Sequence, residues 1–138
     1  MTARVSYLAV GLGCAAGSSL RYLVSVASLN IAGPLFPWGT LAVNVLGSML
    51  IGWLYAYSRH REHGVVARMQ PLLMAGFCGG FTTFSLFSLE TLYLLKTGQP
   101  GLAVIYLVAS VSLWMLAVGM GYWLGSGATS RSITNGTR

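Results

Sequence analysis

Charged side chains are scarce in this sequence. Lysine, arginine, aspartate and glutamate make up 7% of the 138 residues, whereas they make up about 25% of a typical soluble domain. Only two residues are acidic, Glu62 and Glu90. So little charge cannot cover a water-exposed surface, and we therefore expect lipid to be the solvent of this fold.

Motifs of enzymes and metal sites are also missing. The sequence has no repeat, no nucleotide-binding loop, no HExxH pair and no Ser/His/Asp set, so we do not expect an enzyme. Cys14 and Cys78 lack CxxC or metal-ligand spacing, and we expect them to be packing residues. His60 and His63 lie in a basic segment, where we expect them to be solvated rather than metal-bound.

Long apolar runs dominate what is present. Four of them lie at about residues 5–27, 38–58, 72–95 and 102–124. Each is close to the ~20 residues that cross a bilayer core as a helix, and the first run is too long for a cleavable signal peptide. The runs predict a single all-α integral membrane domain with four transmembrane helices, followed by a disordered tail at residues 125–138.

Basic residues are distributed unevenly around these runs. Lys96 and Arg21 lie near one side of the predicted domain. The other side holds Arg4, Arg59, Arg61, Arg68, Arg131 and Arg138. The positive-inside rule predicts cytoplasmic termini for a multi-pass protein of the inner (plasma) membrane. Because this topology accounts for the formal charge of +6, we expect no nucleic-acid partner.

The third run contains a helix-breaking sequence. Gly79 and Gly80 are followed by Thr82 and Thr83, and each glycine weakens a helix by about 1 kcal/mol relative to alanine. Lipid cannot satisfy the backbone groups that a break exposes, so a break survives only where protein buries it or where it lines an ion or water path. We expect the third helix to be broken at Gly79–Thr83 and the function to lie there.

Polar and small residues form stripes on the predicted helices. In the second run, Thr40, Asn44, Ser48 and Gly52 recur every four residues. The Asn44 amide either bonds a neighbouring helix or faces a polar path. After the break, an aromatic stripe of Phe84 and Phe87 runs beside a hydroxyl stripe of Ser85, Ser88 and Thr91. The fourth run adds the hydroxyl pair Tyr106 and Ser110.

Two charged residues lie within the apolar runs. Glu90 is the single carboxylate there, and intramembrane carboxylates are functional candidates, although Glu90 is near enough to the helix end to reach the interface. Arg21 shares a helical face with Gly13 and Gly17, near the end of the first run, and we expect this face to pack on a neighbouring helix. It either snorkels to the interface or forms an electropositive vestibule or an ion pair.

The embedded polar groups suit a small anion. The Asn44 amide and the hydroxyls offer hydrogen-bond donors, and the positive edge of a phenyl ring can also face an anion. A cation path would instead need carboxylates or aimed carbonyls. Four helices are barely enough to enclose such a path, so we expect an oligomer.

Three segments in order make the sequence resemble the Fluc (CrcB) family of fluoride channels. They are GSSLRY from Gly17, GTLAVNVLG from Gly39, and GFCGGFTTFS from Gly76, which continues to Glu90. The resemblance covers nearly the whole chain. It implies a four-helix subunit that forms an antiparallel, dual-topology homodimer in the lipid bilayer, with two pores through which fluoride passively leaves the cytoplasm.

The resemblance also implies roles for individual residues. Its fluoride pathway would contain Asn44, Phe84, Phe87, Ser85, Ser88 and Thr91, with Tyr106 and Ser110. Arg21 and Glu90 would have vestibule or structural roles. The implied cofactor is a structural sodium ion at the dimer centre, held by the backbone carbonyls of Gly79 and Thr82 from both subunits.

Three alternatives stay open. A proton-coupled or multidrug-type exporter would also be a four-helix dimer, but that class needs a glutamate in the first helix, which this sequence lacks. A non-transporting assembly subunit would use the polar stripes only to hold helices together. The excess of arginine on one side favours a single orientation of the subunit, whereas the resemblance implies both.

Overall fold

A computed structural model of the chain, which describes residues 3–60 and 64–135, consists of helices joined by short loops. Its elements are α1 (Ala3–Ala32), α2 (Trp38–His60), α3 (Val65–Arg68), η1 (Pro71–Cys78, a π-helix), α4 (Gly79–Phe81), α5 (Phe84–Lys96) and α6 (Pro100–Asn135). Four stretches are long and apolar enough to cross a membrane: Val5–Ala32, Trp38–Arg59, Pro71–Lys96 and Pro100–Gly127. The predicted all-α fold with four candidate membrane spans is confirmed.

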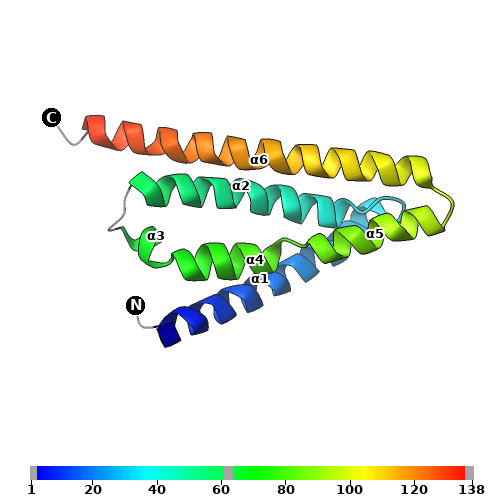
Figure 1. Ribbon diagram of the computed structural model, residues 1–138, viewed down its shortest axis with the longest axis horizontal. Coiled ribbons are helices and arrows are strands. Elements are labelled where there is room, and N and C mark those ends of the chain that lie inside the picture. The colour runs from blue at the N-terminus through cyan, green and yellow to red at the C-terminus, as the bar shows by residue number, and fades with distance from the viewer. Residues whose placement is uncertain (1–2, 61–63, 136–138) are drawn as a thin grey trace.

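The start of α1, the end of α6 and α3 lie at the same end of the bundle (Figure 1). The loops that join α1 to α2 and α5 to α6 lie at the opposite end. Arg59, Arg68 and Arg131 are therefore at the end opposite Lys96, as the charge distribution predicts. The expectations about Arg61, His63 and Arg138 lie outside the described residues.

Glycines bring the helices together in two pairs. α1 packs on η1 and α4, while α2 packs on α6. A Cβ at Gly13 or Gly17 would collide with a backbone carbonyl oxygen of η1, and one at Gly52 or Gly121 would collide with a carbonyl oxygen across the α2–α6 contact. Small residues at such positions let helix backbones approach closely. The prediction that the Gly13–Gly17 face packs on a neighbouring helix is confirmed.

The first helix extends further than predicted. α1 continues to Ala32 and ends at Gly33, whose φ of 74° favours glycine. Arg21 therefore lies well inside α1 rather than near the end of the helix. The local apolar run underestimates the helix because it stops where polar residues begin, although the backbone remains helical.

The last helix is also longer. α6 continues to Asn135, past the expected end at Leu124. No proline interrupts this segment, and Gly125 still packs closely against α2. Residues 125–135, expected to be disordered, are therefore helical in the structure, and residues 136–138 lie outside the described part.

The third membrane span is interrupted, as predicted, but the interruption comes after the glycines. Gly79 has helical dihedral angles (φ −62°, ψ −36°), and Gly80 follows it in α4. Thr82 (φ −80°, ψ 158°) and Thr83 (φ −150°, ψ 121°) are extended, and α5 begins immediately after them. Gly80 instead serves close packing, since a Cβ there would collide with a carbonyl oxygen of α1.

Candidate functional site

Asn44 on α2 holds the interrupted backbone. Its Nδ2 donates to the Thr83 carbonyl oxygen at 2.8 Å, and the Thr83 N–H donates to its Oδ1 at 2.7 Å. Both residues are buried. Because buried backbone groups need hydrogen-bond partners, this pair of bonds stabilises a non-helical segment within the membrane span. Asn44 thus bonds the backbone of the break, and it also lines a cavity beside the break, so its place in a polar path stays a prediction.

Thr83 also caps the helix that follows. Its Oγ1 accepts from the Leu86 N–H at 3.2 Å and lies 3.3 Å from the Ser85 hydroxyl. A threonine at this position satisfies a backbone N–H that has no partner within the helix. Side chains therefore satisfy backbone groups both within the break and at the start of α5.

The carbonyl groups of the last helical turn lose their helical donors at the break, and those of Gly79 and Thr82 are among them. In a continuing helix the Thr83 N–H would donate to Gly79, and the Leu86 N–H would donate to Thr82. Here Asn44 accepts from the first N–H and Thr83 Oγ1 from the second. The carbonyls of Gly79 and Thr82 are the predicted sodium ligands, and carbonyls released at a helix break suit such a cation.

Glu90 joins three helices. Its Oε1 accepts from the Thr40 hydroxyl of α2 at 2.7 Å, and its Oε2 accepts from the Tyr106 hydroxyl of α6 at 2.7 Å. Both donors are buried. Distances this short are typical of O–H bonds to a carboxylate. The Glu90 carboxylate therefore points into the bundle, and it is engaged there by two hydroxyls.

The two phenylalanines after the break differ in exposure. Phe84 is 70% exposed in the single subunit, whereas Phe87 is 4% exposed. The Phe87 ring centroid lies 5.1 Å from that of Tyr106 and 4.9 Å from that of Trp114, which it meets edge-on at 72°. Phe87 is therefore at the centre of an aromatic cluster, and Phe84, 5.6 Å from it, is at the outer side.

Two buried polar atoms on α6 have no hydrogen-bond partner among the described residues: Ser110 Oγ and Trp114 Nε1. Tyr106, Ser110 and Trp114 follow at four-residue intervals and share one face of α6, and Phe87 contacts the first and the third. A buried unsatisfied group costs about 1–3 kcal/mol. Trp114 was not predicted from the sequence, although its spacing extends the Tyr106–Ser110 pair.

The hydroxyl stripe of α5 is partly engaged with its own backbone. Ser88 donates to the Phe84 carbonyl at 2.9 Å, and Thr91 donates to the Phe87 carbonyl at 2.8 Å. Serines and threonines in helices commonly form such bonds. In this arrangement the hydroxyl hydrogens do not face an anion, and the role of the stripe in a fluoride pathway stays a prediction.

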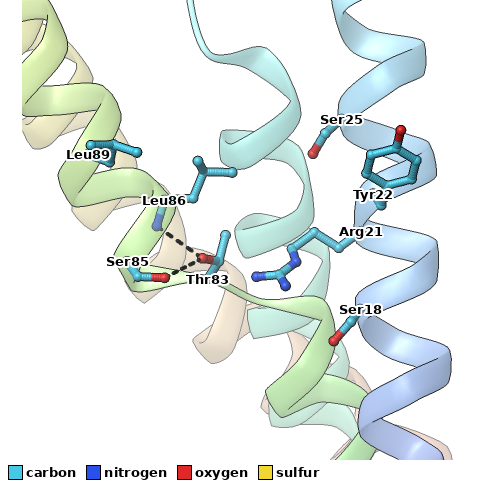
Figure 2. A pocket seen from close by; sticks show the side chains of 8 residues that line it. All are labelled: Ser18, Arg21, Tyr22, Ser25, Thr83, Ser85, Leu86 and Leu89. Atoms are coloured by element: carbon cyan, nitrogen blue, oxygen red, sulfur yellow. Dashed lines mark hydrogen bonds between the residues drawn. The ribbon is translucent and has the colours of Figure 1, made fainter.

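Two cavities flank the break. The larger, of 430 Å³, is lined from α1 by Ser18, Arg21, Tyr22 and Ser25, and from the break and α5 by Thr83, Ser85, Leu86 and Leu89. The guanidinium of Arg21 extends from α1 toward Thr83 across this space (Figure 2). No carboxylate lines it within the described part of the chain, and the alternative roles of Arg21 stay predictions.

The second cavity lies on the α2–α6 side of the break and has a volume of 180 Å³. It is lined by Asn44, Ser48, Thr82, Thr83, Phe84 and Trp114. The structure therefore brings together Asn44, Phe84 and the residues of the break, three of the predicted features. An amide, hydroxyls and aromatic rings surround this space, and none of the lining residues is charged.

Comparison with known proteins identifies the family. Residues 8–122 match the family described as CrcB-like protein, Camphor Resistance (CrcB). The chain is 53% identical over 111 residues to the fluoride-specific ion channel FluC of Rhizobium meliloti (strain 1021), covering 80% of this chain and 88% of that one. It is 47% identical over 116 residues to FluC of Agrobacterium fabrum (strain C58 / ATCC 33970), covering 84% and 92% respectively. The chain therefore belongs to the CrcB family, as its sequence motifs indicate.

Proposed function

We propose that this protein is a fluoride-selective channel through which fluoride leaves the cytoplasm passively, so that intracellular fluoride falls. One observation supports it most: beside a helix break, Phe87 packs against Tyr106 and Trp114, and the hydroxyl of Ser110, which lies between those two along α6, has no hydrogen-bond partner in the described part of the chain. Such a wall offers ring edges and hydrogen-bond donors to a small anion. The relatives named fluoride-specific ion channels supply the identity of the ion, and they are channels rather than enzymes.

The channel is an antiparallel, dual-topology homodimer in the inner membrane. Phe84 is 70% exposed in one subunit, and only 11% of the most apolar stretch of α1 is buried. Lipid by itself could cover exposed apolar residues. Phe84, however, also lines the cavity beside the break, and a single subunit does not close this cavity. A second copy against this face would complete a pore wall, which supports the dimer that the family resemblance implies.

A structural sodium ion at the dimer centre would be held by the carbonyls of Gly79 and Thr82 from both subunits. The diversion of their helical donors to Asn44 and Thr83 supports this assignment. Bound sodium would supply positive charge that fixes the two broken helices against each other. We expect the dimer to melt at a lower temperature when sodium is replaced by N-methylglucamine, and an unchanged melting temperature would count against the site.

Replacing the phenylalanine rings tests the pathway. Phe84→Ile and Phe87→Ile keep apolar volume but remove the ring edge, so we expect fluoride efflux from liposomes to fall sharply while size-exclusion chromatography still shows the dimer. Phe77→Ile is the matched control, because this ring stacks on Phe81 at 5.8 Å before the break. Normal efflux through both pathway variants would count heavily against the proposal.

The exporter interpretation receives less support. Both oxygens of Glu90 accept hydrogen bonds from neighbouring helices, which suits a structural carboxylate. We expect fluoride flux to be independent of an imposed proton gradient in the wild type and in Glu90→Gln. Proton-dependent transport that Glu90→Gln abolishes would favour the exporter instead.

A further inference from the structure

The indole of Trp114 forms part of the wall of the 180 Å³ cavity beside the break. Asn44, Thr83 and Phe84 line the same space from α2, the break and α5. The Trp114 Nε1 atom is closed to solvent and has no hydrogen-bond partner among the described residues. A tryptophan N–H that is buried usually has an acceptor, so this position calls for an explanation.

We propose that the Trp114 indole N–H donates a hydrogen bond to fluoride as the ion passes the helix break, an inference that rests on the proposed function. An indole nitrogen can only donate, so the acceptor must carry a lone pair. Where the protein supplies none, a conducted anion does. Hydrogen bonds to an ionised acceptor are roughly twice as strong as neutral ones, which compensates for the desolvation of the N–H.

The surroundings hold the indole in place for this role. Phe87 meets the Trp114 ring edge-on, with centroids 4.9 Å apart and an angle of 72°. Phe87 itself is 4% exposed and packs on Tyr106. A ring fixed by aromatic contacts presents its N–H in one direction without help from a polar neighbour. The ring is therefore held in place, and no acceptor among the described residues competes for its N–H.

Ser110 is a second donor on α6, one helical turn before Trp114. Its hydroxyl is also buried without a hydrogen-bond partner among the described residues. Four residues separate the two, which is about 6 Å along a helix axis. A fluoride ion leaving one donor would meet the other after one helical turn. The two donors together form a short ladder on the α6 wall.

The same substitution at two tryptophans of α6 separates donation from packing. Trp114→Phe keeps an aromatic ring against Phe87 but removes the N–H. We expect fluoride efflux from liposomes to fall about tenfold, which is about 1.4 kcal/mol. Trp123→Phe is the matched control, since the Trp123 side chain is 72% exposed on the same helix, and its efflux should equal that of the wild type.

Nuclear magnetic resonance of the indole protons gives a second readout that packing alone would not change. The chain has four tryptophans, so tryptophan labelled with ¹⁵N gives few indole signals. Exchanging sodium chloride for sodium fluoride should move one indole proton downfield, namely the signal that is missing in Trp114→Phe. If Trp114→Phe fails to assemble, Phe replacements at Trp38, Trp53 and Trp123 assign the other three signals, and the remaining signal belongs to Trp114. The effect of fluoride on that signal in the wild type then tests the inference.

The outcomes distinguish this inference from the proposed function. Reduced efflux in Trp114→Phe together with a fluoride-dependent Trp114 signal supports it. Efflux in Trp114→Phe equal to that of a conducting wild type, or a Trp114 signal that fluoride does not move, overturns the inference. Neither result contradicts the proposed channel function. A wild type that conducts no fluoride overturns both.

Discussion

A single amide replaces the partners that a helix loses when it breaks within a membrane. Asn44 both donates to and accepts from the backbone of Thr83, which is the geometry of a pair of backbone bonds. This explains how an extended segment persists where lipid offers no hydrogen bonds. At the residue scale, the break is therefore a property of two helices rather than of one.

Removing this amide should destabilise the subunit. Asn44→Ala leaves the N–H and the carbonyl of Thr83 buried without partners, at about 1–3 kcal/mol each. We expect a clearly lower melting temperature in detergent and loss of fluoride efflux. Ser48→Ala is the matched control, since Ser48 lies one turn further along the same face of α2 and lines the same cavity. A wild-type melting temperature for Asn44→Ala would show that Thr83 finds other partners.

The sequence marks individual residues of the candidate site, but it does not show their hydrogen-bond partners. The spacing of Asn44 within a polar stripe marks it as unusual, yet Thr83 lies 39 residues away along the chain. The position of Glu90 in the sequence is near enough to the helix end for it to reach the interface, whereas hydroxyls of α2 and α6 hold its carboxylate inside the bundle. In the sequence Trp114 is an ordinary apolar residue, and only the structure shows that its N–H has no acceptor among the residues it describes.

At the scale of the elements, glycines decide which helices meet. α2 and α6 approach so closely that a Cβ at Gly121 would collide with the Met49 carbonyl oxygen of α2. Such close approach increases the dispersion contacts between the two helices, and these contacts are a main force between helices in lipid. α2 and α6 line the 180 Å³ cavity on one side of the break, and α1 lines the 430 Å³ cavity on the other.

Two glycines of α6 allow a matched test of this contact. Gly121→Ala would push α6 away from α2, so we expect a lower melting temperature and weaker fluoride efflux. Gly119 has open space around its Cβ position, so Gly119→Ala should be neutral or stabilising by up to about 1 kcal/mol, through helix propensity. Equal melting temperatures for the two variants would contradict the role of Gly121 in packing.

The four spans could be predicted because apolar length is a local property of the sequence. The break lies within the predicted Gly79–Thr83, but its exact residues could not be predicted, since propensity points to Gly79 and Gly80, whereas the structure keeps both helical against α1. Tertiary packing there outweighs the intrinsic cost of glycine in a helix. The extended residues are instead Thr82 and Thr83, where the hydrogen bonds from Asn44 are available.

At the scale of the whole molecule, the charge distribution and the proposed dimer make different demands. Arg59 and Arg68 lie at one end of the bundle and Lys96 at the other, and such a bias favours one orientation. An antiparallel dimer needs both orientations in comparable amounts. The family resemblance supports the dimer, so the bias has to be weak enough in effect to permit both.

Labelling from one side of the membrane measures the orientation directly. A Gln99→Cys variant, with Cys14 and Cys78 replaced by alanine, carries its cysteine in the loop between α5 and α6. We expect a membrane-impermeant maleimide added to intact cells to label about half of the protein, as dual topology requires. Labelling of nearly all or nearly none would show a fixed orientation and contradict the antiparallel dimer.

Fluoride efflux from liposomes that contain only the wild-type protein tests the central claim most directly. A fluoride electrode would record fluoride release after valinomycin allows potassium to balance the charge. A chloride electrode would record release from chloride-loaded liposomes as the comparison. We predict rapid release of fluoride and no release of chloride above that of protein-free liposomes. Fluoride release no faster than from protein-free liposomes, or equal release of both anions, would contradict the account.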